Sequence, residues 1–171
     1  MVLIHTALQS EAQYLIEYFK LKKYSSVPKV FKNENIVLVV SGIGKDFTYS
    51  SLKHIFTSFK FSKTINIGTA GCSNKSIEIG TLVCTNKQLK NIEYLSLQTV
   101  DISKTSALEK DENTLFDMEA KYFEEVCRKY ISEENIYIFK VVSDYLSDEV
   151  FSKEFVKQLI KKNIKSLSKW I

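Results

Sequence analysis

Residues 117–144 read DMEAKYFEEVCRKYISEENIYIFKVVSD, and this stretch decides the fold. Apolar residues at helical spacing in its first half predict a helix of roughly 12 residues, about 18 Å long. The nearly unbroken apolar run over 135–142 predicts a strand that is buried on both faces. A strand that retraces the helix would bring Glu119, before the helix, close to Asp144, after the strand. Two carboxylates around one pocket suit acid–base chemistry, although capping of backbone groups is the simpler interpretation of the spacing alone.

Strands and helices alternate along the rest of the chain, with a block of consecutive strands in the middle. We predict a helix that begins at Ser10 with a capping box to Gln13, and a final helix whose apolar stripe, from Val150 to Ile171, packs in the core. The other predicted elements are strands over 2–7, 29–32, 36–40, 64–68, 77–84 and 94–100, and a helix that ends near Phe59. This order predicts one domain over residues 1–171, a three-layer α/β/α sandwich around a mixed, twisted sheet.

Length and composition fit one domain with a sizeable core. The chain has 171 residues, of which 44% are hydrophobic, and it contains neither a linker nor a low-complexity segment. Its net charge is +4, and lysine alternates with glutamate along most of the chain. The lysines between Lys157 and Lys169 recur at helical spacing, which predicts a solvated helix face and no nucleic-acid partner.

The cysteines and histidines argue against a metal site or a disulfide framework. Three cysteines, an odd number, and two histidines lack the spacing of metal ligands. No apolar run reaches the length of a membrane span, and residues 1–5 fit a strand better than a signal peptide. We therefore expect a reduced, cytoplasmic protein without a membrane partner, a metal or another cofactor.

Acidic and small residues gather where the predicted strands end. Glu11 falls in the first turn of the helix after the first strand, where the helix dipole favours a carboxylate. Glycine-bracketed turns follow two further strands, at 41–45 (SGIGK) and 68–71 (GTAG). The first of these turns matches neither a P-loop nor a dinucleotide fingerprint, because each motif requires a glycine that is absent here. Ligands of α/β sheets bind beyond the carboxyl ends of the strands, so these features and the two carboxylates of 117–144 predict one site.

Six short motifs occur in order along the chain. They are ALQSE at 7–11, SGIGK at 41–45, INIGTAG at 65–71, IGTLV at 79–83, DMEA at 117–120 and VSD at 142–144. Together they resemble the purine nucleoside phosphorylase/uridine phosphorylase superfamily, and most closely its methylthioadenosine/S-adenosylhomocysteine nucleosidases. The resemblance implies cleavage of the N-glycosidic bond of a purine nucleoside, with a 5′-modified adenosine as the expected substrate.

The resemblance also implies roles for individual residues. Asp144 would protonate N7 of the leaving purine, with Ser143 orienting it, and Glu11 would position or activate the attacking water. Glu119 would bind the 2′- and 3′-hydroxyls of the ribose, and Met118 would pack on the sugar. The remaining contacts would come from Thr69, Ala70 and Gly71 around the sugar and base, and from Val100, Asp101 and Ile102 beside the purine.

Charge near the predicted site favours hydrolysis over phosphorolysis. Phosphorylases of this superfamily bind phosphate with arginines, whereas the single arginine here, Arg128, lies in the middle of a predicted helix. Glu11 would repel phosphate. A phosphate-dependent phosphorylase and a nucleoside-binding protein without activity remain the alternatives.

The sequence departs from those nucleosidases in places. Thr6 stands where they have glycine in the first strand, and Lys140 stands where they have arginine. The stretch between Gly80 and Asp117 is shorter than its counterpart, which in those enzymes helps to build a dimer and covers the 5′ substituent and the base. The resemblance makes a homodimer one expectation, although the shortening removes part of the segment that builds it. A more open site could admit another purine nucleoside, such as one of the futalosine type.

Overall fold

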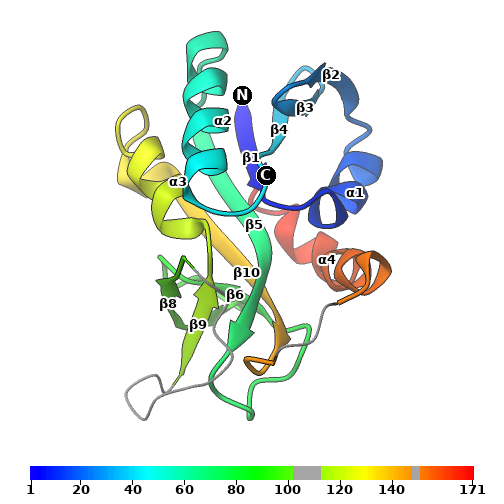
Figure 1. Cartoon of the computed structure of the whole chain (residues 1–171), viewed down its shortest axis with the longest axis vertical. Helices are drawn as coiled ribbons and strands as arrows, with labels where there is room; N and C mark the ends of the chain where they lie inside the picture. Colours follow the sequence, from blue (N-terminus) through cyan, green and yellow to red (C-terminus); the bar gives the residue numbers. More distant parts are fainter. Residues whose placement is uncertain (102–112, 148–150) are drawn as a thin grey trace.

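The computed structural model describes residues 1–101, 113–147 and 151–171. Within these ranges ten strands form a single sheet, and four α-helices cover its two faces (Figure 1). A short 3-10 helix, η2 (Glu133–Asn135), precedes the last strand. In chain order the strands and α-helices are β1 (Val2–Thr6), α1 (Gln9–Tyr18), β2 (Lys22–Ser26), β3 (Lys29–Lys32), β4 (Ile36–Val40), α2 (Lys45–Ser58), β5 (Lys63–Cys72), β6 (Leu82–Cys84), β7 (Glu93–Tyr94), β8 (Ser96–Thr99), β9 (Thr114–Asp117), α3 (Ala120–Cys127), β10 (Ile136–Asp144) and α4 (Lys153–Leu167).

The sheet is mixed, and its parallel strands share one carboxyl edge. β1 lies parallel to β4 and β5, and β10 lies parallel to β5. β3 and β6 run antiparallel to their neighbours β4 and β10. The residues that follow β1, β4 and β10 therefore come together at the same edge, beside the end of β5.

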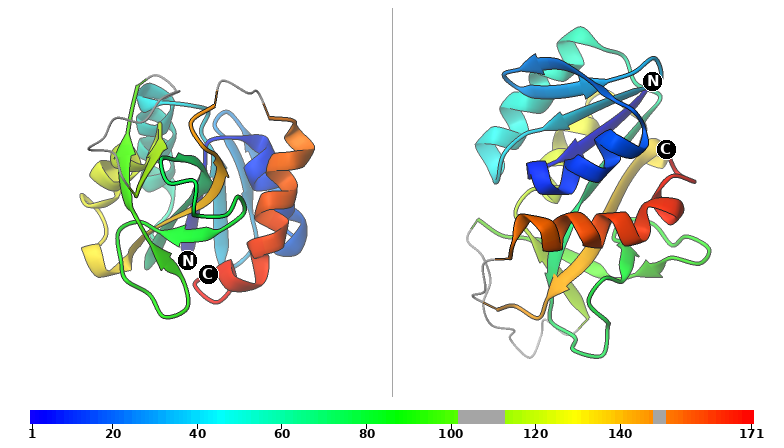
Figure 2. Two further views of the ribbon diagram at one scale, coloured as in Figure 1. Left: turned by 90° about the horizontal axis from the view of Figure 1, so that it is seen from below. Right: turned by 90° about the vertical axis from the view of Figure 1, so that its right-hand side faces the viewer.

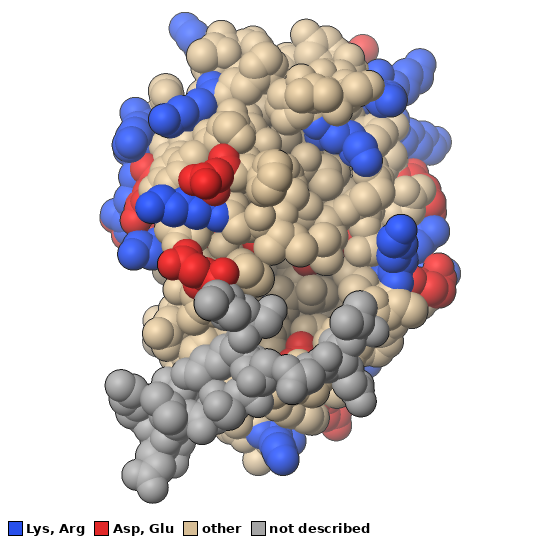
Figure 3. All heavy atoms as spheres, viewed as in Figure 1, with Lys and Arg blue, Asp and Glu red and all other residues tan. Residues whose placement is uncertain are grey.

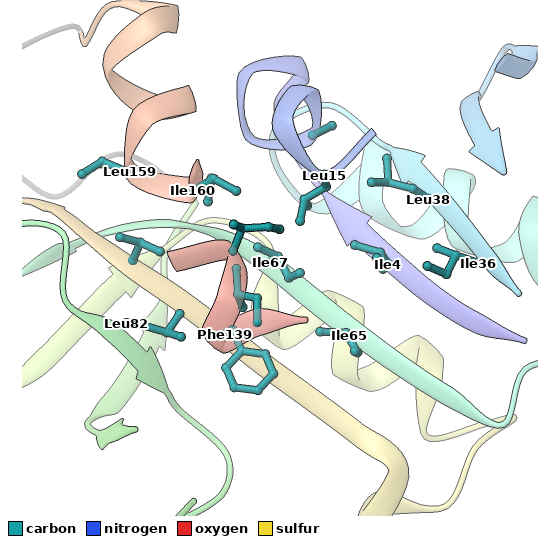
Figure 4. Packing of buried hydrophobic residues seen from close by; sticks show 14 of the residues in the cluster. Ile4, Leu15, Ile36, Leu38, Ile65, Ile67, Leu82, Phe139, Leu159 and Ile160 are labelled. Atoms are coloured by element: carbon teal, nitrogen blue, oxygen red, sulfur yellow. The ribbon is translucent and has the colours of Figure 1, made fainter. Parts of the chain in front are cut away.

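Two helices pack on each face of the sheet. α1 and α4 cover one face, and α2 and α3 cover the other (Figures 1 and 2). Successive side chains of a strand point to opposite faces of the sheet, so each strand contributes to both core layers. In β1, Leu3 packs with α2 and α3, whereas Ile4 packs with α1 and α4. Figure 4 shows the core under α1 and α4, where Leu15 of α1, Ile160 of α4 and Ile67 of β5 belong to one apolar cluster. The predicted three-layer sandwich around a mixed sheet is confirmed.

Strand β5 is longer than the sequence predicted. It continues from Gly68 through Thr69–Gly71 to Cys72, where a turn was expected. Tertiary partners hold the extension, because β10 pairs with it up to Asp144 and β9 pairs with its last two residues. Residues Thr69–Gly71 therefore reach the edge of the sheet from within a strand. The prediction of a turn at residues 68–71 was wrong because local glycine content does not reveal these partner strands.

The first and third helices also differ from the prediction. α1 begins at Gln9, and the side chain of Glu11, not Gln13, turns back to the backbone amide of Leu8, with 2.9 Å between Oε2 and N. α3 has 8 residues, shorter than the roughly 12 that the periodicity suggested. Its apolar stripe persists beyond the point at which the backbone leaves the helix.

The final helix starts later than expected. The hydroxyl of Ser152 accepts a hydrogen bond of 3.1 Å from the amide of Phe155, which is the N-cap geometry, and α4 begins at Lys153. Phe151 consequently precedes the helix, and Val150 lies outside the described residues. The predicted strand over 77–84 is reduced to β6, and β2 is a strand that the sequence did not predict.

Three further observations concern the described ranges. None of their helices combines the length and hydropathy needed to cross a bilayer. No cluster of three or more His, Cys, Asp or Glu side chains in these ranges is arranged to hold a metal ion. Cys72, Cys84 and Cys127 are buried free thiols.

Candidate active site

A cleft of about 240 Å³ opens at the carboxyl edge of the parallel strands. Figure 3 shows a hollow near the centre of this face with acidic atoms visible inside it. The ends of β1, β4, β5, β9 and β10 all contribute to its walls. The described residues that line it are Ala7, Leu8, Glu11, Ile43, Thr69, Ala70, Gly71, Val100, Phe116, Asp117, Met118, Glu119, Ser143, Asp144, Leu146, Ser147 and Phe151.

Glu11 is a buried carboxylate held by four hydrogen bonds. Its Oε2 accepts from the amides of Ala7 and Leu8, at 3.1 and 2.9 Å. Its Oε1 accepts from the amide and the hydroxyl of Thr69, at 2.9 and 3.2 Å. The carboxylate therefore joins the end of β1 to β5. These donors lock its position at the floor of the cleft, because a carboxylate has about four acceptor sites in all.

Glu119 lies at the N-terminus of two helices. It is the N-cap residue of α3, and its Oε1 accepts a hydrogen bond of 2.7 Å from the amide of Gly44, the N-cap residue of α2. Burial, which disfavours the charged carboxylate, raises its pKa from 4.5 to about 7. Asp117 and Glu11 push the pKa in the same direction, whereas Lys140 and the Gly44 amide oppose the rise.

Lys140 lies within β10 and forms a buried ion pair with Asp117. The distance from Nζ to Oδ2 is 2.7 Å, and the two side chains are 2% and 1% exposed. Asp117 also accepts from the hydroxyl of Thr99 at 2.6 Å and from the amide of Ala120 at 2.8 Å, which fixes the start of α3. Burial alone would lower the pKa of Lys140, but the charges of Asp117, Glu119 and Glu11 outweigh it and raise the pKa.

Asp144 is oriented by its own turn. Its Oδ2 accepts from the hydroxyl of Ser143 at 2.7 Å, and its Oδ1 accepts from the amides of Leu146 and Ser147, at 2.8 and 3.3 Å. A β-bulge in the pairing with β5 falls between Val142 and Asp144. Bulges re-aim a side chain, and here the carboxylate of Asp144 lines the cleft.

Two glycines of β5 make room for these acids. A Cβ on Gly68 would lie 3.1 Å from Oε1 of Glu11 and 3.3 Å from Nζ of Lys140. A Cβ on Gly71 would lie 3.0 Å from Oδ1 of Asp144 and 2.9 Å from Cδ2 of Leu146. The charged groups thus approach the backbone of β5 more closely than any side chain on it would allow.

No protein-family model matches the chain, and no curated protein sequence matches it. Solved structures do. The 5′-methylthioadenosine/S-adenosylhomocysteine nucleosidase of Neisseria meningitidis, in complex with methylthio-immucillin-A, has a TM-score of 0.81 at 19% identity, over 99% of this chain and 97% of that one. Futalosine hydrolase of Helicobacter pylori has a TM-score of 0.81 at 15% identity, over 99% and 96%. This chain has the nucleoside phosphorylase fold. At these identities the likeness concerns the fold, so the reaction is argued from the site.

The nucleoside phosphorylase fold brings most of the predicted site residues to one cleft. The predicted lining residues are Glu11, Thr69, Ala70, Gly71, Val100, Met118, Glu119, Ser143 and Asp144. Asp101 differs, because it is exposed and its carboxylate accepts a hydrogen bond of 2.6 Å from the hydroxyl of Tyr122. Ile102 lies outside the described residues.

Several lining residues were not predicted. Leu8, Ile43, Phe116, Leu146, Ser147 and Phe151 all line the cleft. Phe151 had been assigned to the core stripe of the final helix, and that assignment was wrong because α4 starts after it. The pairing of Lys140 was also missed. A lysine inside the apolar run IYIFKVVSD does indicate that the tertiary structure must supply a buried partner for its charge.

His5 on β1 is buried and takes part in a chain of hydrogen bonds. Nδ1 of His5 accepts from Nδ2 of Asn66 at 2.8 Å, so Nε2 carries the proton that is shared with Oγ of Ser41 at 2.9 Å. Ser41 in turn donates to the carbonyl of Gly42 at 2.7 Å. Burial, reinforced by the charge of Lys140, lowers the pKa of His5 to about 3. This neutral chain of hydrogen bonds crosses from β5 through β1 to the turn that carries Gly44.

Proposed function

We propose that this protein is a purine nucleoside N-ribohydrolase that acts on a 5′-modified adenosine or a related purine nucleoside. The observation that carries the proposal is the charge of the cleft. Its described lining contains four acidic side chains, Glu11, Asp117, Glu119 and Asp144, and neither lysine nor arginine, although Asp117 is paired with the buried Lys140. Breaking the N-glycosidic bond builds positive charge on the ribose, and a cleft of this charge favours it.

In the proposed reaction Asp144 gives a proton to N7 of the purine as the bond to C1′ breaks. A water molecule adds its oxygen to C1′ and gives one proton to Glu11, so the products are the free sugar, which keeps its 5′ substituent, and a neutral base. The proton passes back to Asp144 through solvent once the products leave. The hydroxyl of Ser143, 2.7 Å from Oδ2 of Asp144, orients this acid. Its other oxygen is anchored by the turn amides, which leaves the side chain little freedom to turn away from the base.

Glu11 holds the attacking water in this proposal. Of its four hydrogen bonds, that from the hydroxyl of Thr69 is the longest, at 3.2 Å. A hydroxyl rotates at small cost, so a water molecule can take its place on Oε1 while Thr69 turns to accept from that water. The three backbone amides keep the carboxylate fixed during the exchange.

Glu119 and Met118 bind the ribose, with the carboxylate accepting from the 2′- and 3′-hydroxyls. Leu8, Ile43 and Phe151 give the cleft an apolar side that suits a 5′ substituent with little charge. The structural neighbours support this substrate class, since one is a nucleosidase in complex with methylthio-immucillin-A and another is a futalosine hydrolase.

The decisive experiment measures base release from methylthioadenosine, S-adenosylhomocysteine, adenosine, inosine and futalosine, with and without phosphate. We expect adenine or hypoxanthine from at least one nucleoside, the free sugar with its 5′ substituent as the second product, and no acceleration by phosphate. Strict dependence on phosphate would replace the hydrolase with a phosphorylase. Binding without release of any base would leave a nucleoside-binding protein.

A further inference from the structure

Lys140 is the buried cation of the acidic cluster. It occupies the middle of β10, where the register places it opposite Gly68 of β5. Lysine is almost never fully buried unless it is paired, because removing an ammonium from water is costly. Its nearest partner is Asp117, with 2.7 Å between Nζ and Oδ2.

The ammonium faces more than one acid. The space that a Cβ on Gly68 would fill is bordered by Nζ of Lys140 and by Oε1 of Glu11, so both groups crowd the same point of the backbone. Glu119 interacts with the same charge from the segment before α3. Lys140 is thus ion-paired with Asp117 and acts electrostatically on Glu11 and Glu119, and these three acids line the same cleft.

We propose that Lys140 is a positioning residue that keeps Glu119 in its carboxylate form near neutral pH, so that Glu119 can accept both ribose hydroxyls. The role rests on the proposed function of Glu119 in binding the sugar. A carboxylate accepts at both oxygens, whereas a carboxylic acid must use one of them as a donor. The Gly44 amide already occupies one acceptor position of Oε1, so protonation of Oε2 would turn an acceptor for the diol into a donor.

The charges around Glu119 determine the direction of the effect. Lys140 from β10 and the Gly44 amide from the start of α2 stabilise its charge, whereas Asp117 from β9 and Glu11 from α1 destabilise it. Burial has already raised the pKa of Glu119 to about 7, which is the value at which a change in one neighbour alters its charge under physiological conditions. His5, which also responds to the charges of Lys140 and Asp117, stays neutral in this range.

A purely structural ion pair is the competing explanation, and a matched pair of variants separates the two. Lys140→Met removes the cation and Asp117→Asn removes its partner, so both break the same ion pair. A structural role predicts the same kind of damage from each. The positioning role predicts opposite shifts in the pH at which Glu119 titrates, because Lys140 and Asp117 act on it with opposite signs.

The experiment is a pH titration of protein labelled with ¹³C at the side-chain carboxyls of glutamate, observed by NMR, with Glu119→Gln to assign the signal. We expect Glu119 of the wild type to titrate near pH 7. Lys140→Met should move this midpoint upward by about one to three pH units, and Asp117→Asn should move it downward by about one. An unchanged midpoint in Lys140→Met, or shifts in the same direction in both variants, would overturn the proposal.

Each single variant leaves a buried group without its partner, so the double variant Lys140→Met/Asp117→Asn guards against loss of folding. It is expected to move the midpoint upward by less than Lys140→Met alone, and an unchanged or lowered midpoint would count against the proposal. The kinetic arm follows KM for methylthioadenosine against pH, which should rise where Glu119 becomes protonated while kcat changes less. The titration needs no substrate, so absence of nucleoside cleavage would overturn the proposed hydrolase without changing the titration result.

Discussion

The backbone amide of Gly44 donates a hydrogen bond of 2.7 Å to the carboxylate of Glu119. This contact joins the glycine turn after β4 to the residue that caps α3, 75 positions further along the chain. Gly44 has a φ of 92°, which favours glycine, and its amide belongs to the N-terminus of α2, where a helix attracts negative charge. The glycine turn, which matches no phosphate-binding motif in sequence, thus receives a carboxylate from the protein itself.

Removing the proposed acid should abolish base release. Asp144→Asn retains the size of the side chain but cannot donate the proton, so we expect kcat to fall by about 10²- to 10⁴-fold. Ser143→Ala, which removes only the orienting hydroxyl, should cost less. Both are measured by base release from the best nucleoside of the panel. Wild-type activity in Asp144→Asn would rule out Asp144 as the acid.

Glu11→Gln should damage both folding and activity. The carboxylate accepts four hydrogen bonds, three of them from backbone amides, and a glutamine has a single acceptor oxygen, so at least one backbone donor loses its partner. We expect a loss of about 1–3 kcal/mol in the free energy of unfolding. Urea unfolding measures it. Glu17→Gln on the exposed side of α1 is the matched control and should stay within about 0.5 kcal/mol of wild type.

Gly68→Ala should affect activity more than stability. Alanine in a strand is normally favourable relative to glycine by roughly 0.5–1 kcal/mol, which offsets part of the crowding. The added Cβ would press on Glu11 and Lys140 at 3.1 and 3.3 Å. A displacement of this kind can cost about 10²-fold in rate. A variant with full activity and an unchanged melting temperature would show that Glu11 and Lys140 can shift to make room for the added Cβ without loss of function.

Glu119 should make the protein less stable as the pH rises. Its pKa is about 7 in the folded protein against 4.5 as the ordinary value, so the folded state holds the proton more tightly. The resulting stability is present below pH 4.5 and is lost as the pH rises through 7, which amounts to about 3 kcal/mol. Thermal unfolding of wild type and Glu119→Gln from pH 4.5 to 8 measures the difference. Parallel curves for the two proteins would contradict the raised pKa.

His5 should act in the opposite direction. Its pKa is lowered from 6.5 to about 3, so between these pH values the unfolded chain binds a proton that the folded protein does not bind. Stability should therefore fall as the pH drops below 6.5, by about 5 kcal/mol once pH 3 is reached. His5→Gln should remove this acid sensitivity. His54→Gln, at an exposed position on α2, is the control and should keep it.

Much of the candidate site could be predicted because the motif residues follow or end strands of one sheet. Parallel strands bring their carboxyl ends to a common edge, so Glu11 after β1 and Asp144 at the end of β10 had to approach one another once the strands were assigned. Asp101 shows where this reasoning stops. It follows a strand as well, yet its carboxylate turns to Tyr122 on α3 and does not line the cleft.

The sequence by itself determined the alternation of strands and helices, the mixed sheet they form and the edge at which the acids gather, because periodicity and turn residues are local properties. Only the tertiary structure decided how those acids are held. The length of β5 depends on β9 and β10, the start of α4 leaves Phe151 in the cleft, and Lys140 is charged inside the core because Asp117 meets it there. Each of these depends on contacts between residues far apart in the chain, and the energy of a buried charge is set by such neighbours.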